Sequence, residues 1–300
     1  MAKNVKRQTT APTRNRKLVY AAAALMVVLI PAVYFYSVSL NQPSEAKAAI
    51  IDQLGSSKLD KAIRDENQTF LESAKELLYK RFSVIDYYSD NATVEQYRQL
   101  ASAGYKLILW RAHSALDLDT KYIAISTTEK NDSISYKQYY SLYYDGKLTL
   151  VNITGDPTLY WGITSTFIDQ VMTGTFQDTV IVLMSCNGLQ QDYLLTAQAF
   201  EAKGAKVIIS WDNWVSTSDN DYATSLLLQY LIDENDTVSV AVSKIPLSSS
   251  PGFELARLQY YPHSPDVANY VIPDYRKHDG TNSALMIVPF SEKVEEPMGN

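Results

Sequence analysis

Uninterrupted apolar runs alternate along the chain with amphipathic stretches, and this alternation predicts strands and helices in turn. The runs at 105–114 and 179–189 are rich in valine, isoleucine and leucine, without regular polar positions. Such runs are typical of strands covered on both faces, as in a parallel sheet with helices on each side. Apolar residues recur at helical spacing over 94–101 and 193–201. The whole order predicts a mainly parallel, layered α/β domain.

A different pattern lies between the two apolar runs. Segments 122–130 and 136–153 alternate like antiparallel strands, and Asp145-Gly146 is typical of the turn of a hairpin. The second segment is rich in tyrosine, which suits a strand and also suits a binding surface. The interpretation as ordinary strands and the interpretation as a surface both remain open on the sequence alone.

Capping signals predict where two of the helices begin. Thr93 and Gln96 have the spacing of a capping box, in which a threonine hydroxyl and a residue three positions later satisfy the first free N–H groups. Ser218 and Asp221 are predicted to open a later apolar helix at 222–232.

The start of the chain has the pattern of a membrane anchor. Residues 18–40 carry no charge and match the ~20 apolar residues that a bilayer requires. Basic residues without any acidic partner precede this run: Lys3, Lys6, Arg7, Arg14, Arg16 and Lys17. The positive-inside rule therefore predicts a cytoplasmic tail at 1–17, an anchor at 18–40 and an extracytoplasmic remainder in the cell membrane. We expect a helical stalk at 41–80 and one domain at 81–300.

Five sequons follow the predicted anchor and agree with this topology, because N-glycans are added outside the cytoplasm. They begin at Asn67, Asn91, Asn131, Asn152 and Asn235. The sequence therefore predicts a membrane-bound glycoprotein.

Composition excludes several functional classes. With 46% hydrophobic residues, 20% charged residues and a net charge of −6, the chain is globular and lacks the basic surface that nucleic acid requires. One cysteine and three histidines form no recognisable metal-ligand spacing, and no Gly-rich phosphate loop is present. We therefore expect no metal, no cofactor and no nucleic-acid partner.

A thiol and an imidazole occupy equivalent places in the two apolar runs. His113 lies at the end of the first run, and Cys186, the only cysteine, lies near the end of the second. Open α/β sheets bind ligands beyond the carboxyl ends of their strands, so both side chains are predicted to lie where such folds carry out chemistry. The alternative is that Cys186 is an inert buried residue, as free cysteines often are.

The order of these residues resembles a known family. Histidine at a strand end, followed 73 residues later (186 − 113) by a strand-end cysteine, is similar to the caspase-like cysteine peptidases of clan CD. Residues 197–214, AQAFEAKGAKVIISWDNW, resemble the CHAT and separase branch. The likeness covers roughly 81–245 and implies a helix-sheet-helix sandwich. Ser114 stands where the family usually has glycine.

The resemblance implies a thiol protease, a hydrolase in which His113 and Cys186 form the catalytic dyad. It places the oxyanion donors at the amides of Ser114 and Cys186. It also makes Asp212, and more distantly Asp219, the candidates for selecting a substrate with Arg or Lys before the cleaved bond. The alternative is that Asp212 only caps the turn that follows it. We therefore expect a membrane-anchored, extracytoplasmic cysteine endopeptidase acting on proteins or peptides. The alternative is an inactive caspase-like binding module or surface scaffold on a stalk.

Overall fold

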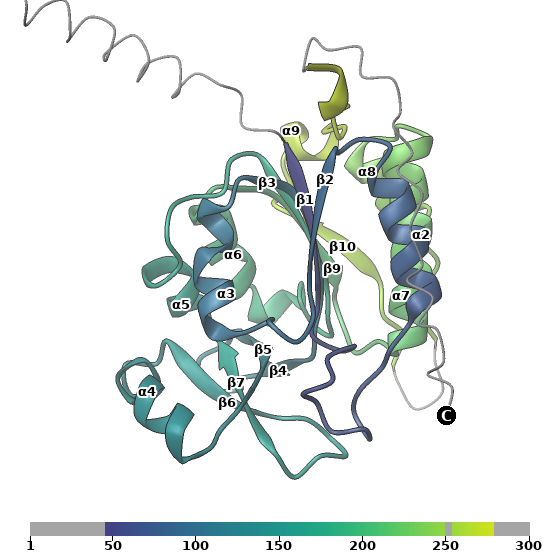
Figure 1. The fold of residues 1–300 in the computed structure, drawn as a ribbon. Coiled ribbons are helices and arrows are strands. Elements are labelled where there is room, and N and C mark those ends of the chain that lie inside the picture. The colour runs from purple at the N-terminus through teal and green to yellow at the C-terminus, as the bar shows by residue number, and fades with distance from the viewer. Residues whose placement is uncertain (1–45, 250–253, 279–300) are drawn as a thin grey trace, which may run out of the picture. The chain divides into compact units, whose positions relative to one another are not determined.

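A six-stranded sheet forms the centre of the fold in the computed structural model, which describes residues 46–249 and 254–278 (Figure 1). Its strands follow the order β10-β9-β8-β3-β1-β2, and all neighbours are parallel except β10 and β9. The strands are β1 Lys47–Asp52, β2 Val84–Tyr88, β3 Tyr105–Arg111, β8 Thr179–Met184, β9 Ala205–Trp211 and β10 Leu258–Tyr261. The predicted mixed α/β class with a mainly parallel sheet is confirmed.

Helices cover both faces of this sheet, so its apolar strands are buried on each side (Figure 1). One face packs against α2 Gln68–Leu78, α7 Thr217–Leu228 and α8 Val238–Ser243. The other packs against α3 Val94–Gln99, α5 Ser165–Gln170 and α6 Leu195–Ala202. Alternate side chains of each strand serve the two layers: Ile50 and Leu109 face the first set, and Ile51 and Ile108 the second.

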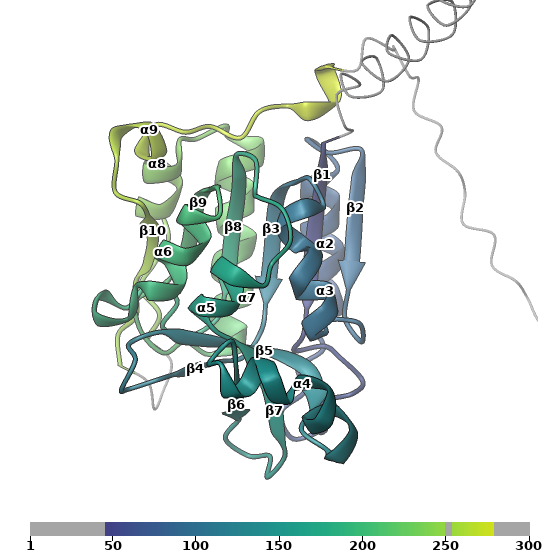
Figure 2. The ribbon, with the colours of Figure 1, turned by 90° about the vertical axis from the view of Figure 1, so that its left-hand side faces the viewer.

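A second, four-stranded antiparallel sheet follows directly from β3, beyond the carboxyl ends of the central strands (Figure 2). Its order is β4-β5-β7-β6, with β4 Ser114–Leu116, β5 Ile123–Lys130, β7 Leu159–Ile163 and β6 Leu148–Asn152. The short remaining elements are η1 Leu100–Ser102, η2 Gln191–Tyr193, η3 Gln229–Asp233, α9 Pro265–Ala268 and η4 Tyr275–His278.

The tyrosine-rich part of segment 136–153 is a helix, α4 Ser133–Tyr144, so its prediction as a strand is wrong, whereas the end of the segment forms the antiparallel strand β6 as predicted. Asp132 caps the helix by accepting from the N–H groups of Ile134 and Ser135, which the alternation pattern did not reveal. Tyr136 and Tyr143 contact Trp161, with ring centroids 6.4 and 5.8 Å away. Aromatic packing at helical spacing therefore overrides the strand propensity of tyrosine.

The expected stalk at 41–80 is also wrong for the part that the structure describes. Residues 47–52 form β1, which lies between β2 and β3 and is almost wholly buried. Segment 53–67 has no regular secondary structure, and only α2 is helical. The run Lys-Ala-Ala-Ile-Ile-Asp has ordinary helix formers, but pairing on both edges decides its conformation. The domain thus begins before 81.

The membrane prediction concerns a part of the chain that lies outside the described residues, namely 1–17 and 18–40. Within the described ranges, no helix is both long and apolar enough to cross a membrane.

Helix α7 begins five residues earlier than predicted. Its N-cap is Ser216, whose hydroxyl accepts from the N–H of Asp219, so Ser218 and Asp221 lie inside the helix. The carboxylate of Asp221 faces a buried arginine instead of the helix start. The predicted cap at Thr93 is confirmed, because its hydroxyl accepts from the N–H of Gln96.

The strand order locates the crevice of the central sheet. From β1 the chain moves outward to β2 and then returns to the opposite side of β1 as β3. Ligands of open α/β sheets bind beyond the carboxyl ends of the strands at such a reversal. Segment 53–67, which follows β1, and His113, which follows β3, both lie at this end of the sheet.

Candidate active site

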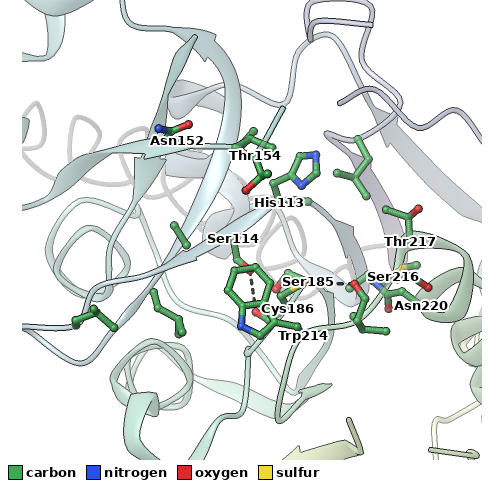
Figure 3. Close-up of a pocket in the computed structure, with 18 residues that line it drawn as sticks. His113, Ser114, Asn152, Thr154, Ser185, Cys186, Trp214, Ser216, Thr217 and Asn220 are labelled. Carbon is green, nitrogen blue, oxygen red and sulfur yellow. Dashed lines mark hydrogen bonds between the residues drawn. The ribbon is translucent and has the colours of Figure 1, made fainter. Parts of the chain in front are cut away.

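A cavity of about 780 Å³ lies at the carboxyl ends of β3 and β8, and it is lined by both His113 and Cys186 (Figure 3). The strand register explains why the two residues meet there. Arg111 and Met184 are paired across β3 and β8, and His113 and Cys186 each stand two residues beyond that pair. Equal offsets from one register position bring the two chain segments to the same level of the sheet.

The ring of His113 is held by a main-chain carbonyl from the loop after β1. Its Nε2 lies 3.2 Å from the carbonyl oxygen of Ile63. A carbonyl oxygen only accepts hydrogen bonds, so Nε2 carries the hydrogen and Nδ1 is the acceptor of the neutral ring. Burial lowers the pKa of His113, and the Ile63 carbonyl partly opposes that shift. The neutral base form is therefore favoured at neutral pH.

The backbone of His113 is fixed by a buried glutamine from the same loop. Gln53 is 0% exposed; its Oε1 accepts from the N–H of His113 at 2.9 Å, and its Nε2 donates to the carbonyl of Thr127 at 3.3 Å. Both groups of the side-chain amide are thus used, one toward β3 and one toward β5. The residue after β1 therefore positions the imidazole through its backbone.

The thiol of Cys186 is half-buried and has a carbonyl partner of its own. Its Sγ lies 3.5 Å from the carbonyl oxygen of Val215, to which it donates. Burial raises the pKa of the Cys186 thiol. Among the hydrogen bonds of the described residues, none joins this sulfur to the His113 ring. The described arrangement is therefore a neutral thiol and a neutral imidazole in one cavity.

Ser114 links the two strand ends. Its hydroxyl donates to the carbonyl oxygen of Cys186 at 2.8 Å (Figure 3). The N–H of Asn187 donates to the carbonyl of Asn213 at 3.0 Å, so both polar groups of the peptide after Cys186 are held. Ser114, at a position where the resembled peptidases usually have glycine, thus supplies a contact to the cysteine segment. The role of the Ser114 and Cys186 amides as oxyanion donors stays a prediction.

The turn after Cys186 depends on close backbone approach. Asn187 has a φ of 58°, in the left-handed region, and Asn tolerates this region better than most residues. A Cβ at Gly188 would collide with the hydroxyl of Ser210. Glycine is therefore required where this turn crosses β9.

Replacing Ser114 by alanine is expected to lower the free energy of unfolding by about 1 kcal/mol, because the Cys186 carbonyl loses its hydroxyl donor. Urea unfolding of the full chain measures this. Ser243→Ala is the matched control, since the Ser243 hydroxyl also donates to a carbonyl at 2.8 Å but at an exposed position of α8. Equal changes in the two variants would contradict a specific link between the strand ends.

The two acidic residues predicted to select the substrate do not line the cavity. The Asp212 carboxylate accepts from the N–H of Arg257 at 2.7 Å and from Gln259 Nε2 at 3.2 Å, which fastens β10 to the end of β9. Asp219 accepts from the Ser248 hydroxyl at 2.6 Å. The structure therefore does not bring them together with His113 and Cys186. Trp214, from the same segment, lines the cavity.

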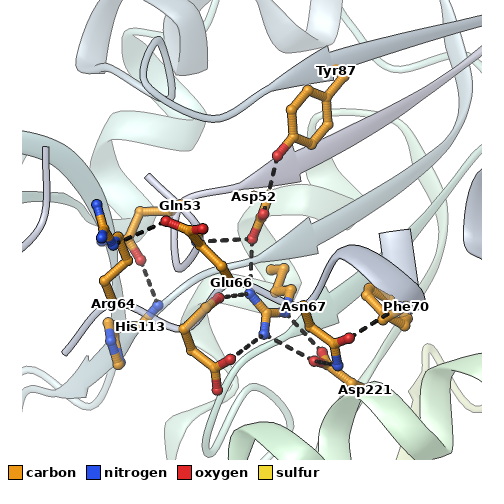
Figure 4. A network of polar contacts seen from close by, with 12 residues as sticks. Asp52, Gln53, Arg64, Glu66, Asn67, Phe70, Tyr87, His113 and Asp221 are labelled. Carbon is orange, nitrogen blue, oxygen red and sulfur yellow. Dashed lines mark hydrogen bonds and ion pairs between the residues drawn. The ribbon is translucent and has the colours of Figure 1, made fainter. Parts of the chain in front are cut away.

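A buried ionic network beneath the site was not predicted from the sequence (Figure 4). Arg111 is 0% exposed and makes a bidentate ion pair with Asp221, at 2.7 and 2.9 Å, and another with Asp52 at 2.9 Å. It also donates to the carbonyl of Asp65 at 2.7 Å. These carboxylates raise the pKa of Arg111 against the opposing effect of burial, so it stays charged. The only indication of this network in the sequence is that Arg111 is a charged residue at the end of an apolar strand.

This network ties the loop after β1 to β3 and α7. Asp52 ends β1, Asp65 belongs to the loop, and Asp221 lies in α7. Asn67, the N-cap of α2, donates to Asp221 Oδ2 at 2.9 Å. The loop that supplies Gln53 and the Ile63 carbonyl is thus anchored at both ends.

The predicted glycosylation sites differ in accessibility. The Asn67 amide is engaged at both ends, accepting from the N–H of Phe70 and donating to Asp221. Asn91 and Asn235 are exposed, and Asn152 is exposed on the lining of the cavity. Glycosylation itself stays a prediction.

No model of a known protein family matches this sequence, and no curated protein matches it. In the described ranges, no group of three or more His, Cys, Asp and Glu side chains is arranged to hold a metal ion. The likeness to caspase-like peptidases therefore rests on the residues quoted for it.

Proposed function

We propose that this chain is a caspase-like cysteine endopeptidase with His113 and Cys186 as its catalytic dyad. The observation that carries the proposal is the shared register: one cavity receives an imidazole from the end of β3 and a thiol from the end of β8. A base oriented by a third group is the usual arrangement for activating a nucleophile. Here the orienting group is the Ile63 carbonyl.

The proposed reaction begins from the neutral pair. When substrate enters, the thiol leaves the Val215 carbonyl and gives its proton to His113 Nδ1, while sulfur bonds to the peptide carbonyl carbon. The carbonyl electrons move to oxygen, which the Ser114 and Cys186 amides would stabilise. The C–N bond then breaks, and His113 returns the proton to the departing amine. Water, deprotonated by the same nitrogen, then bonds to the carbonyl carbon of the thioester. The C–S bond breaks, and His113 returns the proton to sulfur, which releases the acid and restores the thiol.

The proposed setting is the outer face of a membrane. It is supported by the sequence pattern of 1–17 and 18–40, which predicts a cytoplasmic tail and a single anchor. The catalytic domain would then act on extracytoplasmic proteins or peptides.

The test is to incubate the purified full-length protein with a mixed peptide library and to identify new termini by mass spectrometry. We expect cleavage by the wild type and none by Cys186→Ala, because the variant lacks the nucleophile. Unchanged cleavage by Cys186→Ala would overturn the proposal.

A binding module is the second candidate, favoured by one observation. The Cys186 thiol and the His113 ring are each hydrogen-bonded to a different main-chain carbonyl and not to each other. This arrangement is what a site that catalyses no reaction would have. Peptides that are retained by the wild-type protein, yet recovered intact after long incubation, would support this function.

A further inference from the structure

The cavity that holds His113 and Cys186 is lined without any acidic side chain, lysine or arginine from the described residues. Apolar side chains form much of its wall: Leu54, Ala112, Leu116, Met184 and Val215. The polar ones are neutral amides and hydroxyls, among them Asn152, Thr154 and Thr217. A charged substrate residue would therefore lose water there without meeting a partner, which is unfavourable.

Two large apolar side chains at this cavity are exposed to solvent. Leu118 is 67% exposed and Trp214 is 46% exposed, and both line the cavity. One comes from the chain after β4 and the other from the chain after β9, so two separate segments present apolar surface. Apolar surface gathered at a concave site is typical of a place where an apolar ligand binds.

The carboxylates of the ionic network beneath the cavity are engaged by Arg111. Both oxygens of Asp221 accept from Arg111, and Asp52 accepts from Arg111, from the N–H of Gly55 and from the Tyr87 hydroxyl. Neither residue lines the cavity, and nor does Asp65. A basic substrate residue would thus find no carboxylate among the lining side chains.

One polar group of the lining residues has no hydrogen-bond partner within the described residues. Ser185 is 3% exposed and lines the cavity, and its hydroxyl makes no hydrogen bond within the described residues. A buried hydroxyl without a partner is destabilising, and because this oxygen is closed off from solvent it offers no partner to a charged substrate residue. This hydroxyl precedes the nucleophile directly in the chain.

We infer that the substrate residue supplying the attacked carbonyl is large and apolar, of the leucine or phenylalanine class. The inference rests on the proposed function and replaces selection by Asp212 or Asp219. The volume of about 780 Å³ is within the range of small-ligand sites and is ample for such a side chain with its neighbours. Met184, unbranched and adaptable, lies in the wall that would receive it.

Matched peptides carrying Leu, Phe, Arg or Asp at that position test the inference with the full-length wild-type protein. We expect kcat/KM for Leu and Phe to exceed that for Arg and Asp by about 10- to 100-fold. A preference for Arg or Asp would overturn it.

A negative charge placed at the edge of the cavity should change which substrate residue is preferred before the cleaved bond. Leu118→Asp is expected to raise the Arg-to-Leu ratio of kcat/KM about 10-fold, because it supplies the missing carboxylate. Leu255→Asp is the matched control, since Leu255 is 64% exposed and does not line the cavity. An equal shift in both variants would contradict a role for the lining.

Binding to Cys186→Ala separates this inference from the proposed function. If the wild type cleaves nothing, fluorescence anisotropy of the same labelled peptides still reports the preference of the cavity. Tighter binding of the Leu and Phe peptides would support the inference while the peptidase proposal fails. Equal or tighter binding of Arg or Asp peptides would overturn the inference.

Discussion

Replacing His113 by alanine is expected to lower kcat/KM for peptide cleavage by about 10²- to 10⁴-fold, the usual contribution of a positioned general base. The variant loses Nδ1, the acceptor that the Ile63 carbonyl leaves free. Steady-state cleavage of one peptide by the full-length protein measures the loss. His263→Ala is the control, because His263 is exposed and its ring contacts Tyr260 instead of the cavity.

The pH profile of the wild type offers a second readout of the same residue. The reaction needs neutral His113, and burial lowers the pKa of this ring. The neutral form therefore persists to lower pH than in an ordinary histidine. On the acid side, kcat/KM should reach half of its maximum at a pH below about 6.5. A half-maximum clearly above that value, or an unaltered rate in His113→Ala, would show that another group is the base.

Replacing Arg111 by methionine is expected to lower the free energy of unfolding by about 3–5 kcal/mol. The loss is large because Asp52 and Asp221 have side chains only 1% and 5% exposed, and each would remain as a buried charge without its partner. Denaturant unfolding followed by circular dichroism measures the change. Lys80→Met is the control, since Lys80 pairs with Asp233 at 2.8 Å but the side chains are 46% and 36% exposed.

The exposed control pair should contribute only about 0–1 kcal/mol. Adding Asp221→Asn to Arg111→Met should restore part of the stability, because one uncompensated charge is then removed. If Arg111→Met and Lys80→Met lower the free energy of unfolding by equally small amounts, the buried charges of the network do not depend on Arg111 for their stability.

The parts of the fold that could be predicted are those whose signal is local. The continuous apolar run of β8 is visible in the sequence, and so is the cap at Thr93. His113 and Cys186 were placed in one cavity from strand ends alone, since parallel strands share their carboxyl edge.

The missed features depend on contacts between distant segments. The β1 run resembles a helix until β2 and β3 pair with it on both edges. Arg111 meets Asp52 and Asp221 across 59 and 110 positions of the chain, so no local window contains the network. The Asp212 carboxylate is directed by the N–H of Arg257, 45 residues later in the chain and just before β10. Tertiary pairing decides each of these cases.

The group that orients the His113 ring is a peptide carbonyl, and this has a consequence for mutagenesis. Every residue has such a carbonyl, so an alanine scan cannot delete the one at Ile63. Substitution there acts through the buried side chain, which packs with Leu59 and Tyr160, and so reports packing. Chemical synthesis that replaces the Ile63–Arg64 amide by an ester would weaken this acceptor and leave every side chain unchanged. Evolution can likewise exchange Ile63 for another apolar residue that fits this cluster without losing the acceptor, provided that the path of the loop is kept.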